Sequence, residues 1–155
     1  MPTQSLRLED AAAWRGCALA YGHFNTIHPG HIRYLRHARG LGEQLVVALI
    51  GDGKTRYAFQ QKERAEALSL LGIADALVLL DADELNKAID VLQPKVLVLG
   101  NEFKHNTEIQ TTLVQQRQTQ DGRIRCGVWG RRHWPKHRSS GGSGLRRTDH
   151  CCRSL

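Results

Sequence analysis

The sequence lacks the features that mark membrane-spanning and secreted proteins. No apolar run in its 155 residues approaches the roughly 20 residues of a membrane span. The N-terminus has no basic stretch followed by an apolar core, so we expect no secretory signal. The four cysteines, Cys17, Cys126, Cys151 and Cys152, show no paired C-x-x-C spacing, and Cys17 lies in an apolar segment. We therefore expect a reduced, cytoplasmic setting, no membrane partner, and one domain with a tail.

Acidic residues are almost absent from the last 33 residues. The whole chain carries a net charge of +7, but residues 1–122 hold 13 Lys+Arg and 14 Asp+Glu. Residues 123–155 hold nine Lys+Arg and a single acid, Asp149. The basic character therefore belongs to the C-terminal segment and says nothing about partners of the rest. We divide the chain into an α/β domain over 1–122 and a basic, Arg/Gly/Ser-rich tail over 123–155.

Apolar segments alternate with amphipathic ones along most of the chain. We expect strands at 17–21, 45–50, 75–80 and 95–99, and helices at 6–15, 32–41, 59–71, 84–92 and 108–118. Continuous apolar runs suit parallel strands that are covered on both faces, and strand–helix alternation implies right-handed crossovers. The sequence therefore predicts an α/β fold, a three-layer Rossmann-like parallel sheet with ligands beyond the carboxyl ends of its strands.

Residues 22–31, Gly-His-Phe-Asn-Thr-Ile-His-Pro-Gly-His, lie where the first apolar strand ends and a helix begins. Pro29 suits the first helical position, which puts His28 near the N-cap and His31 in the first turn, on the same side. The N–H groups there are unpaired and attract anions, phosphate above all. Gly22 and Gly30 let a ligand approach the backbone. The pattern indicates chemistry on a phosphoryl group; the alternatives are exposed histidines at a helix start or two ligands of a structural metal.

This segment resembles the H-x-G-H signature of the cytidylyltransferase-like nucleotidyltransferases, among them glycerol-phosphate cytidylyltransferases and the nucleotidyl domain of ADP-heptose synthases. Five residues match the pattern G-x-F-D-x-x-H-x-G-H in register: Gly22, Phe24, His28, Gly30 and His31. Asn25 replaces the usual Asp. Residues 49–52, 63–64 and 99–103 resemble further family elements, with Glu102 and Phe103 in place of Asp and a larger aromatic. The resemblance covers roughly residues 7–122.

The resemblance implies that a substrate phosphate attacks the α-phosphorus of a nucleoside triphosphate and releases pyrophosphate. We expect His28 and His31 to be catalytic, because imidazoles near neutral pH can align and stabilise the oxygens in transfer. We expect CTP or ATP as the nucleotide and a small phosphorylated sugar or alcohol as the acceptor. An Mg²⁺ ion is expected on the triphosphate oxygens, with no protein side chain assigned as its ligand. A homodimer stays open, and nucleic acid is not expected as a partner.

The remaining candidate site residues fall into two groups. The expected nucleotide contacts are Gly22, His23, Phe24, Asn25, Gly30, Gly100, Asn101 and Glu102. The expected phosphate ligands are Lys54, Arg56 and Arg64. The alternatives are a solvated loop for Lys54 and Arg56 and an intrahelical pair with Glu63 or a neighbour for Arg64. The sequence does not favour a P-loop at 51–55, because Ala48, inside a strand, occupies the position of its first glycine.

The C-terminal segment lacks the family's second signature, about S-[ST]-[ST]-x-[IL]-[RK]; only residues 143–146 resemble it faintly. Three readings stay open: a basic arm that binds nucleic acid, a Cys/His metal-binding extension, and an accidental continuation from a shifted reading frame. The last explains both the composition and the missing signature. We therefore expect the final strand and helix of the sheet to be missing, residues 129–155 to be disordered or poorly packed, and turnover to be weak. The rival function is a non-catalytic nucleotide- or nucleic-acid-binding protein.

Overall fold

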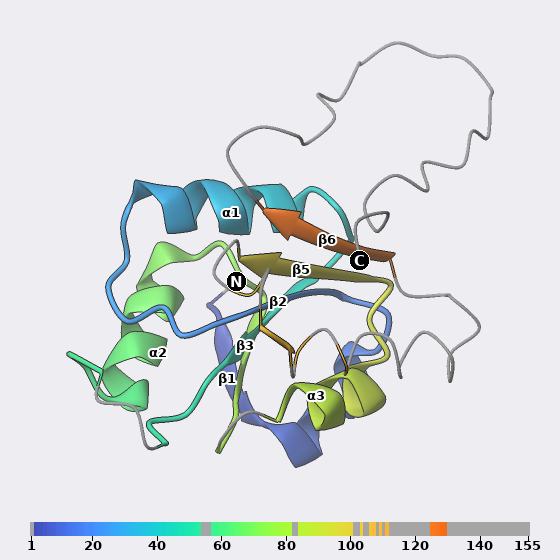
Figure 1. Ribbon diagram of the computed structural model, residues 1–155, viewed down its shortest axis with the longest axis horizontal. Coiled ribbons are helices and arrows are strands. Elements are labelled where there is room, and N and C mark those ends of the chain that lie inside the picture. The colour runs from blue at the N-terminus through green and yellow to red at the C-terminus, as the bar shows by residue number, and fades with distance from the viewer. Residues whose placement is uncertain are drawn as a thin grey trace, which may run out of the picture.

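The computed structural model describes residues 2–53, 57–81, 84–100, 103, 106, 107, 109 and 111, together with the backbone of residues 125–129. Its elements follow one another as drawn in Figure 1: β1 Gln4–Arg7, the 3₁₀ helix η1 Leu8–Trp14, β2 Ala18–Gly22, α1 Pro29–Arg39, β3 Leu45–Leu49, α2 Gln61–Leu71, β4 Ala76–Leu79, α3 Leu85–Leu92, β5 Val96–Gly100 and β6 Arg125–Trp129. No helix among these described elements is long and apolar enough to cross a membrane.

The strands form one sheet in the order β1-β4-β3-β2-β5-β6, and every neighbouring pair is parallel. The chain moves from β2 through β3 to β4 in one direction and then returns past β2 to β5. Right-handed crossovers therefore put α1 and α2 on one face and α3 on the other, with η1 beside α3 (Figure 1). The predicted three-layer, Rossmann-like parallel sheet is confirmed.

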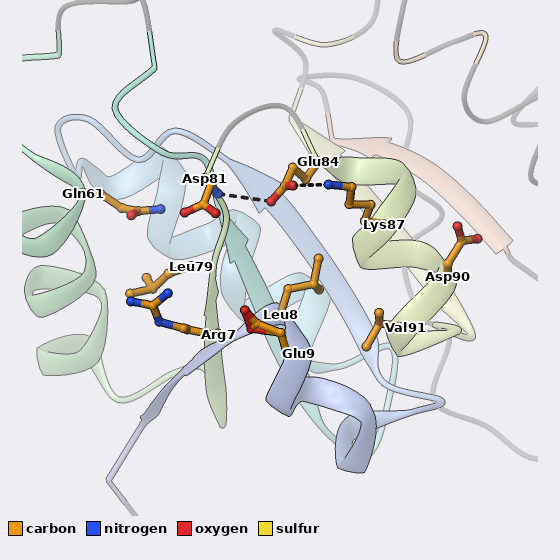
Figure 2. A pocket seen from close by; sticks show the side chains of 10 residues that line it. All are labelled: Arg7, Leu8, Glu9, Gln61, Leu79, Asp81, Glu84, Lys87, Asp90 and Val91. Atoms are coloured by element: carbon orange, nitrogen blue, oxygen red, sulfur yellow. Dashed lines mark hydrogen bonds and ion pairs between the residues drawn. The ribbon is translucent and has the colours of Figure 1, made fainter.

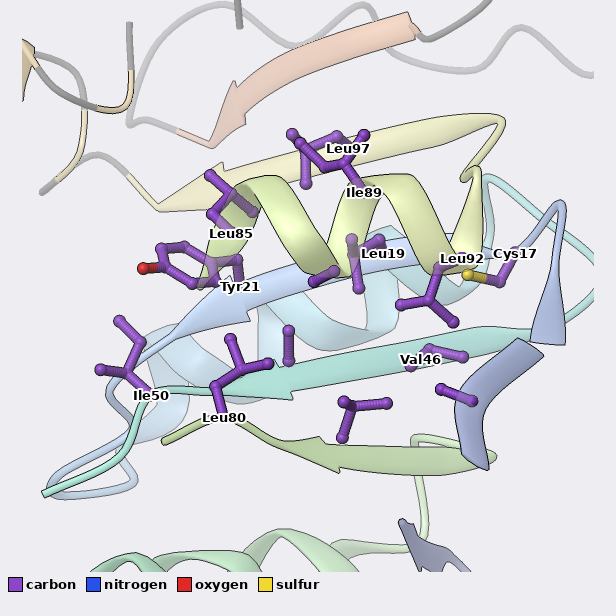
Figure 3. Packing of buried hydrophobic residues seen from close by; sticks show 14 of the residues in the cluster. Cys17, Leu19, Tyr21, Val46, Ile50, Leu80, Leu85, Ile89, Leu92 and Leu97 are labelled. Carbon is purple, nitrogen blue, oxygen red and sulfur yellow. The ribbon is translucent and has the colours of Figure 1, made fainter. Parts of the chain in front are cut away.

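Alternate residues of the central strands fill two separate cores. On the α3 face, Leu19 and Val46 pack with Ile89 and its neighbours on α3, as Figure 3 shows. On the opposite face, Val47 and Val98 pack against the apolar sides of α1 and α2. Each central strand is thus buried on both faces, which is why its sequence reads as a continuous apolar run rather than an alternating one.

The reversal of direction creates a switch point between β2 and β5. In parallel sheets, ligands bind in the crevice beyond the carboxyl ends of the two strands at such a point. The segment 23–28 leaves the carboxyl end of β2, and Phe103 follows the carboxyl end of β5. The fold therefore places the H-x-G-H segment at the position where a ligand is expected.

Both ends of the sheet differ from the prediction. The expected leading helix at 6–15 begins as strand β1, which pairs with β4 in the register Gln4↔Ala76 to Arg7↔Leu79, and only then continues as η1. The expected loss of the final strand is also wrong, because β6 pairs in parallel with β5. These short strands have weak signals of their own and are defined by their pairing partners. The predicted tail at 123–155 therefore contributes a strand, while its residues 130–155 lie outside the described part.

The other predicted elements are found within a few residues of their expected bounds. Helix α1 begins at Pro29, α2 ends before Gly72 in the left-handed conformation, and α3 ends at Leu92 ahead of Pro94. Of the helix expected at 108–118, the described residues Ile109 and Thr111 are helical, and the rest lies outside the described part. The thiol of Cys17 is buried, and burial raises its pKa to about 12, so it is not a nucleophile near neutral pH.

Candidate active site

His28 and His31 cap helix α1 with their own side chains. The N–H of Gly30 donates to Nδ1 of His28 at 3.0 Å, and the N–H of His28 donates to Nδ1 of His31 at 3.3 Å. Pro29 occupies the first helical position and His28 is the N-cap, as predicted. The two ring centroids lie 4.0 Å apart. The expected geometry of the pair is therefore confirmed, whereas a catalytic role remains a proposal.

The cap changes how this helix end meets an anion. We expected unpaired first-turn N–H groups, but Gly30 donates to an imidazole and His31 donates to the carbonyl of His28 at 2.9 Å. Both Nδ1 atoms act as acceptors, so each neutral ring carries its proton on Nε2. The two imidazoles thus cover the positive end of the helix dipole. The N–H groups of Gly30 and His31 are already paired, so an arriving phosphate meets the rings before these backbone donors.

The two imidazoles influence each other's protonation. Burial and the nearby ring of His28 lower the pKa of His31 below its ordinary value of 6.5, and a hydrogen bond with the backbone of Thr26 opposes this shift. A second positive charge next to the first is unfavourable, so the pair resists double protonation. A bound anion beside His31 offsets that penalty and raises the pKa of His31. Binding of phosphate therefore favours protonation of His31.

Gly30 is required by the cap itself. A Cβ atom at this position would lie 2.7 Å from Cε1 and 2.9 Å from Nδ1 of His28, closer than nonbonded atoms approach. Gly22 is tight for a different reason, because its Cβ would lie 3.0 Å from the ring of Phe24. The sequence predicted that these glycines admit a ligand. The structure shows that they also make room for neighbouring side chains.

Phe24 lies beneath the imidazoles. Its ring is 4% exposed, with centroids 5.3 Å from His31 and 6.2 Å from Tyr34. Its backbone adopts a φ of +50°, a conformation that a bulky residue holds only when its surroundings enforce it. Because the ring faces inward, Phe24 supports His31 from below. Its predicted contact with the nucleotide stays a prediction.

Asn25 fastens the H-x-G-H segment to the loop before α2. Its Oδ1 accepts from the N–H of Ala58 at 2.8 Å and from that of Phe59 at 3.4 Å. This contact needs a side-chain oxygen acceptor at the right length, which Asn shares with the Asp usual in the family. The departure at Asn25 therefore removes a charge and retains the acceptor.

Arg64 was predicted to bind phosphate, but the structure gives it another task. Its side chain is 1% exposed, and its guanidinium donates to the carbonyl oxygens of His23, Ile50 and Phe59 at 2.6, 2.9 and 3.1 Å. A further bond of 3.0 Å reaches the carboxylate of Asp52. Four of its five N–H groups are committed by these bonds. Arg64 thus joins the segments after β2 and β3 to α2, and this placement does not favour a phosphate clamp.

The alternative for Arg64, an intrahelical pair with Glu63, is not found either. The carboxylate of Glu63 accepts from the N–H of Gln60 at 2.9 Å and completes a capping box at the start of α2. The Arg64 guanidinium instead lies over the ring of Tyr57, 4.5 Å from its centroid. This stack adds a cation–π contact to the hydrogen bonds around the buried charge.

His23 sits between two aromatic rings at the switch point. Tyr57 forms a hydrogen bond to its Nδ1, and the ring of Phe103 is stacked on it with centroids 5.7 Å apart. Phe103 also lies 5.2 Å from Tyr21, so it joins the carboxyl ends of β2 and β5. The predicted contact of His23 with the nucleotide stays a prediction. Tyr57 was missed, because only the fold brings it to a residue 34 positions earlier.

Two polar residues before and within α2 were also missed as site supports. Oδ1 of Asp52 accepts from the N–H of Gln61 at 2.8 Å as well as from Arg64. The side-chain amide of Gln61 donates to the carbonyls of Leu49 and Leu80 at 3.0 and 2.7 Å. These bonds fasten the start of α2 to the carboxyl ends of β3 and β4. No local pattern signals them, because each depends on contacts between separate elements.

Several predicted site residues cannot be placed. Lys54, Arg56, Asn101 and Glu102 lie outside the described residues. Gly100 is described and ends β5 at the switch point, next to β2 in the sheet. Within the described ranges, no three His, Cys, Asp or Glu side chains come together to hold a metal ion.

A cavity of about 530 Å³ opens elsewhere, at the carboxyl ends of the edge strand β1 and its neighbour β4 (Figure 2). Four acids and two cations line it together with uncharged residues: Glu9, Asp81, Glu84, Asp90, Arg7 and Lys87. Its carboxylates disfavour a triphosphate, and β3 separates it from β2 in the sheet. The imidazole pair at the switch point is therefore the better candidate for phosphate chemistry.

Comparison with known proteins identifies the family of this chain. A family model described as cytidylyltransferase-like matches residues 19–140. The chain belongs to the cytidylyltransferase-like family. The match extends beyond residue 122, where the resemblance was expected to end, and it includes β6. The strands β3, β4, β5 and β6, nearly all of β2 and the H-x-G-H segment therefore lie within one family domain, and β1 lies before the matched range.

The relatives show which kinds of protein carry this domain. The bifunctional protein HldE of Citrifermentans bemidjiense is 37% identical over 103 residues, covering 62% of this chain and 21% of that protein. The HldE of Hyphomonas neptunium is 33% identical over 115 residues, covering 67% and 24%. The chain thus spans about a fifth to a quarter of the length of these relatives.

Solved structures share the fold at low identity. The lipopolysaccharide core biosynthesis protein from Thermoplasma volcanium gives a TM-score of 0.63 at 22% identity, covering 74% of this chain and 96% of that one. Pantoate-beta-alanine ligase from Francisella tularensis, complexed with beta-gamma ATP and beta-alanine, gives 0.59 at 13% identity, covering 86% and 69%. These likenesses support the fold of the family domain.

We predict that Arg64 is essential for stability. Arg64→Met keeps most of the side-chain length and removes every donor, leaving the carbonyls of His23, Ile50 and Phe59 without this partner. We expect a loss of about 2–4 kcal/mol in the free energy of unfolding, as for breaking a buried polar network. Urea denaturation measures it, with Arg36→Met on the exposed side of α1 as the matched control. Equal stability of the two variants would contradict the assignment.

A second prediction concerns pH. Because folding lowers the pKa of His31, the unfolded chain binds a proton here at higher pH than the folded chain does. The stability from this shift is present above about pH 6.5 and is lost as pH falls through the lower folded pKa. Between about pH 7.5 and 5.5, His31→Gln should therefore lose less unfolding free energy than the wild type. Arg36→Gln is the control; a wild-type pH dependence in His31→Gln would refute the shift.

Proposed function

We propose that this chain is a nucleotidyltransferase that transfers CMP or AMP from CTP or ATP to a small phosphorylated sugar or alcohol and releases pyrophosphate. The observation that carries the proposal is the pair of imidazoles capping α1 at the switch point between β2 and β5. Family membership supports the nucleotidyl transfer. A related fold named for lipopolysaccharide core biosynthesis favours a sugar phosphate among the acceptors.

The reaction requires little covalent help from the protein. An oxygen of the acceptor phosphate forms a bond to the α-phosphorus. The bond from that phosphorus to the oxygen bridging the β-phosphate breaks, and its electron pair leaves with pyrophosphate. The acceptor is already an anion, so no proton must be removed from it. The protein has to align the two phosphates and stabilise the charge on the oxygens in transfer.

His28 and His31 fit that task. Their Nδ1 atoms are held by the backbone, which fixes the direction in which each ring presents its other nitrogen. The lowered pKa of His31 keeps that ring ready to gain a proton as anionic charge arrives. The ring of Phe24 packs against that of His31, and Arg64 donates to the carbonyl of His23. These two contacts hold the H-x-G-H segment in place. We propose that both imidazoles donate to phosphate oxygens during transfer.

Other parts of the mechanism stay as predictions. Lys54 and Arg56 remain the candidates to neutralise the triphosphate, with Asn101 and Glu102 as nucleotide contacts. Mg²⁺ would supply further charge neutralisation on the triphosphate when bound. The missing second signature still predicts weak nucleotide binding and slow turnover.

The experiment measures pyrophosphate release by the full chain with CTP and with ATP, against a panel of sugar 1-phosphates and glycerol phosphate. We expect release with one nucleotide and a sugar phosphate. His28→Ala and His31→Ala should each lower kcat/KM by about 10²–10³ while thermal melting shows an intact fold. The control is Leu70→Ala on α2, whose side chain is 82% exposed.

Two outcomes would overturn the proposal. Wild-type turnover in both histidine variants would remove the imidazoles from the mechanism. Absence of pyrophosphate release combined with salt-sensitive nucleic-acid binding, lost on removal of residues 130–155, would favour the non-catalytic alternative.

A further inference from the structure

Tyr34 of α1 places a buried hydroxyl on the join between β2 and β5. The hydroxyl donates to the carbonyl of Val98 at 2.6 Å and accepts from the N–H of Tyr21 at 3.3 Å. Tyr34 is 4% exposed. One side chain of α1 therefore contacts the main chain of both strands that border the switch point.

The contact lies where these strands are paired. The register joins Ala20 to Val98 and Tyr21 to Leu99, so the N–H of Tyr21 and the carbonyl of Val98 lie close together across the join. A phenol bonded to both groups fixes the height and angle of α1 above this point. Apolar packing alone would leave the helix freer to slide, because dispersion contacts have little directionality.

Tyr34 is also linked to the catalytic candidate. It follows His31 by three residues, so the two side chains lie on the same side of α1. The ring of Phe24 contacts both, with centroids 5.3 Å from His31 and 6.2 Å from Tyr34. A shift of the Tyr34 ring would therefore move Phe24 and change its packing against the imidazole of His31.

We propose that Tyr34 is a positioning residue for nucleotidyl transfer, an inference that rests on the function proposed above. Its hydroxyl fixes the first turns of α1 on the β2–β5 join and thereby directs the ring of His31 toward the reacting phosphates. Tyr34 itself does not touch them. No local sequence pattern signals this role of Tyr34, because its hydroxyl meets the carbonyl of Val98 only when β5 returns beside β2.

The test is a double-mutant cycle in the full chain. Tyr34→Phe removes the hydroxyl and keeps the ring, and it should lower kcat about tenfold, the effect of one hydrogen bond, with less than about a twofold change in KM for the nucleotide. If Tyr34 acts through His31, Tyr34→Phe added to His31→Ala should lower kcat no further. A further tenfold loss in the double variant would overturn the proposal.

A control separates positioning from general loosening of the fold. Ile89→Val removes one methylene from α3 on the opposite face of the sheet, away from α1. It should leave kcat and KM at wild-type values well below the melting temperature. If Ile89→Val lowers kcat as much as Tyr34→Phe does, the effect is one of stability and the proposal fails.

A second readout does not depend on activity. The imidazole ¹⁵N and ¹H signals of His31 should shift in Tyr34→Phe and stay at wild-type positions in Ile89→Val. Unchanged His31 signals in Tyr34→Phe would overturn the positioning role. If the wild type releases no pyrophosphate, the proposed function fails by itself, and these spectra still decide whether the hydroxyl orients His31.

Discussion

The buried guanidinium of Arg64 is the constraint on which the candidate site depends. A cation that is 1% exposed is stable only when its donors are satisfied, and here three carbonyls and one carboxylate accept from it. Two of those carbonyls, from His23 and Ile50, belong to segments that leave neighbouring strands. Their positions are therefore fixed relative to each other and to α2.

The imidazole cap completes this arrangement. Helix N-caps are usually formed by short polar side chains such as Ser or Asp, which satisfy backbone donors and stay in place. His28 satisfies a donor in the same way but keeps a second ring nitrogen for other partners. The cap thus stabilises the helix and presents titratable groups at its positive end. The need for Gly30 beneath the ring shows that the backbone is shaped to fit this cap.

The sequence predicted the centre of the fold well because its signals are local. Continuous apolar runs and the Pro29 helix start specify β2, β3, β5 and α1 without reference to distant residues. Strand β1 has Leu6 as its single apolar residue, and the short β6 lies within the basic C-terminal segment, so their pairing with β4 and β5 could not be foreseen. The same limit applies to the site. The H-x-G-H geometry depends on four consecutive residues. In contrast, the hydrogen bond from Arg64 to His23 spans 41 positions of the sequence, and that from Tyr34 to Val98 spans 64.

If the imidazoles of His28 and His31 receive the phosphates of a nucleotide, nucleotide binding must change both rings. An NMR titration of the full chain, with ¹⁵N-labelled histidine, by CTP and by ATP in the absence of acceptor measures this change. We expect saturating nucleotide to shift the ring signals of both residues and to raise the pKa of His31, because bound anionic charge favours the protonated ring. Nucleotide binding that leaves both rings and the pKa of His31 unchanged would contradict it.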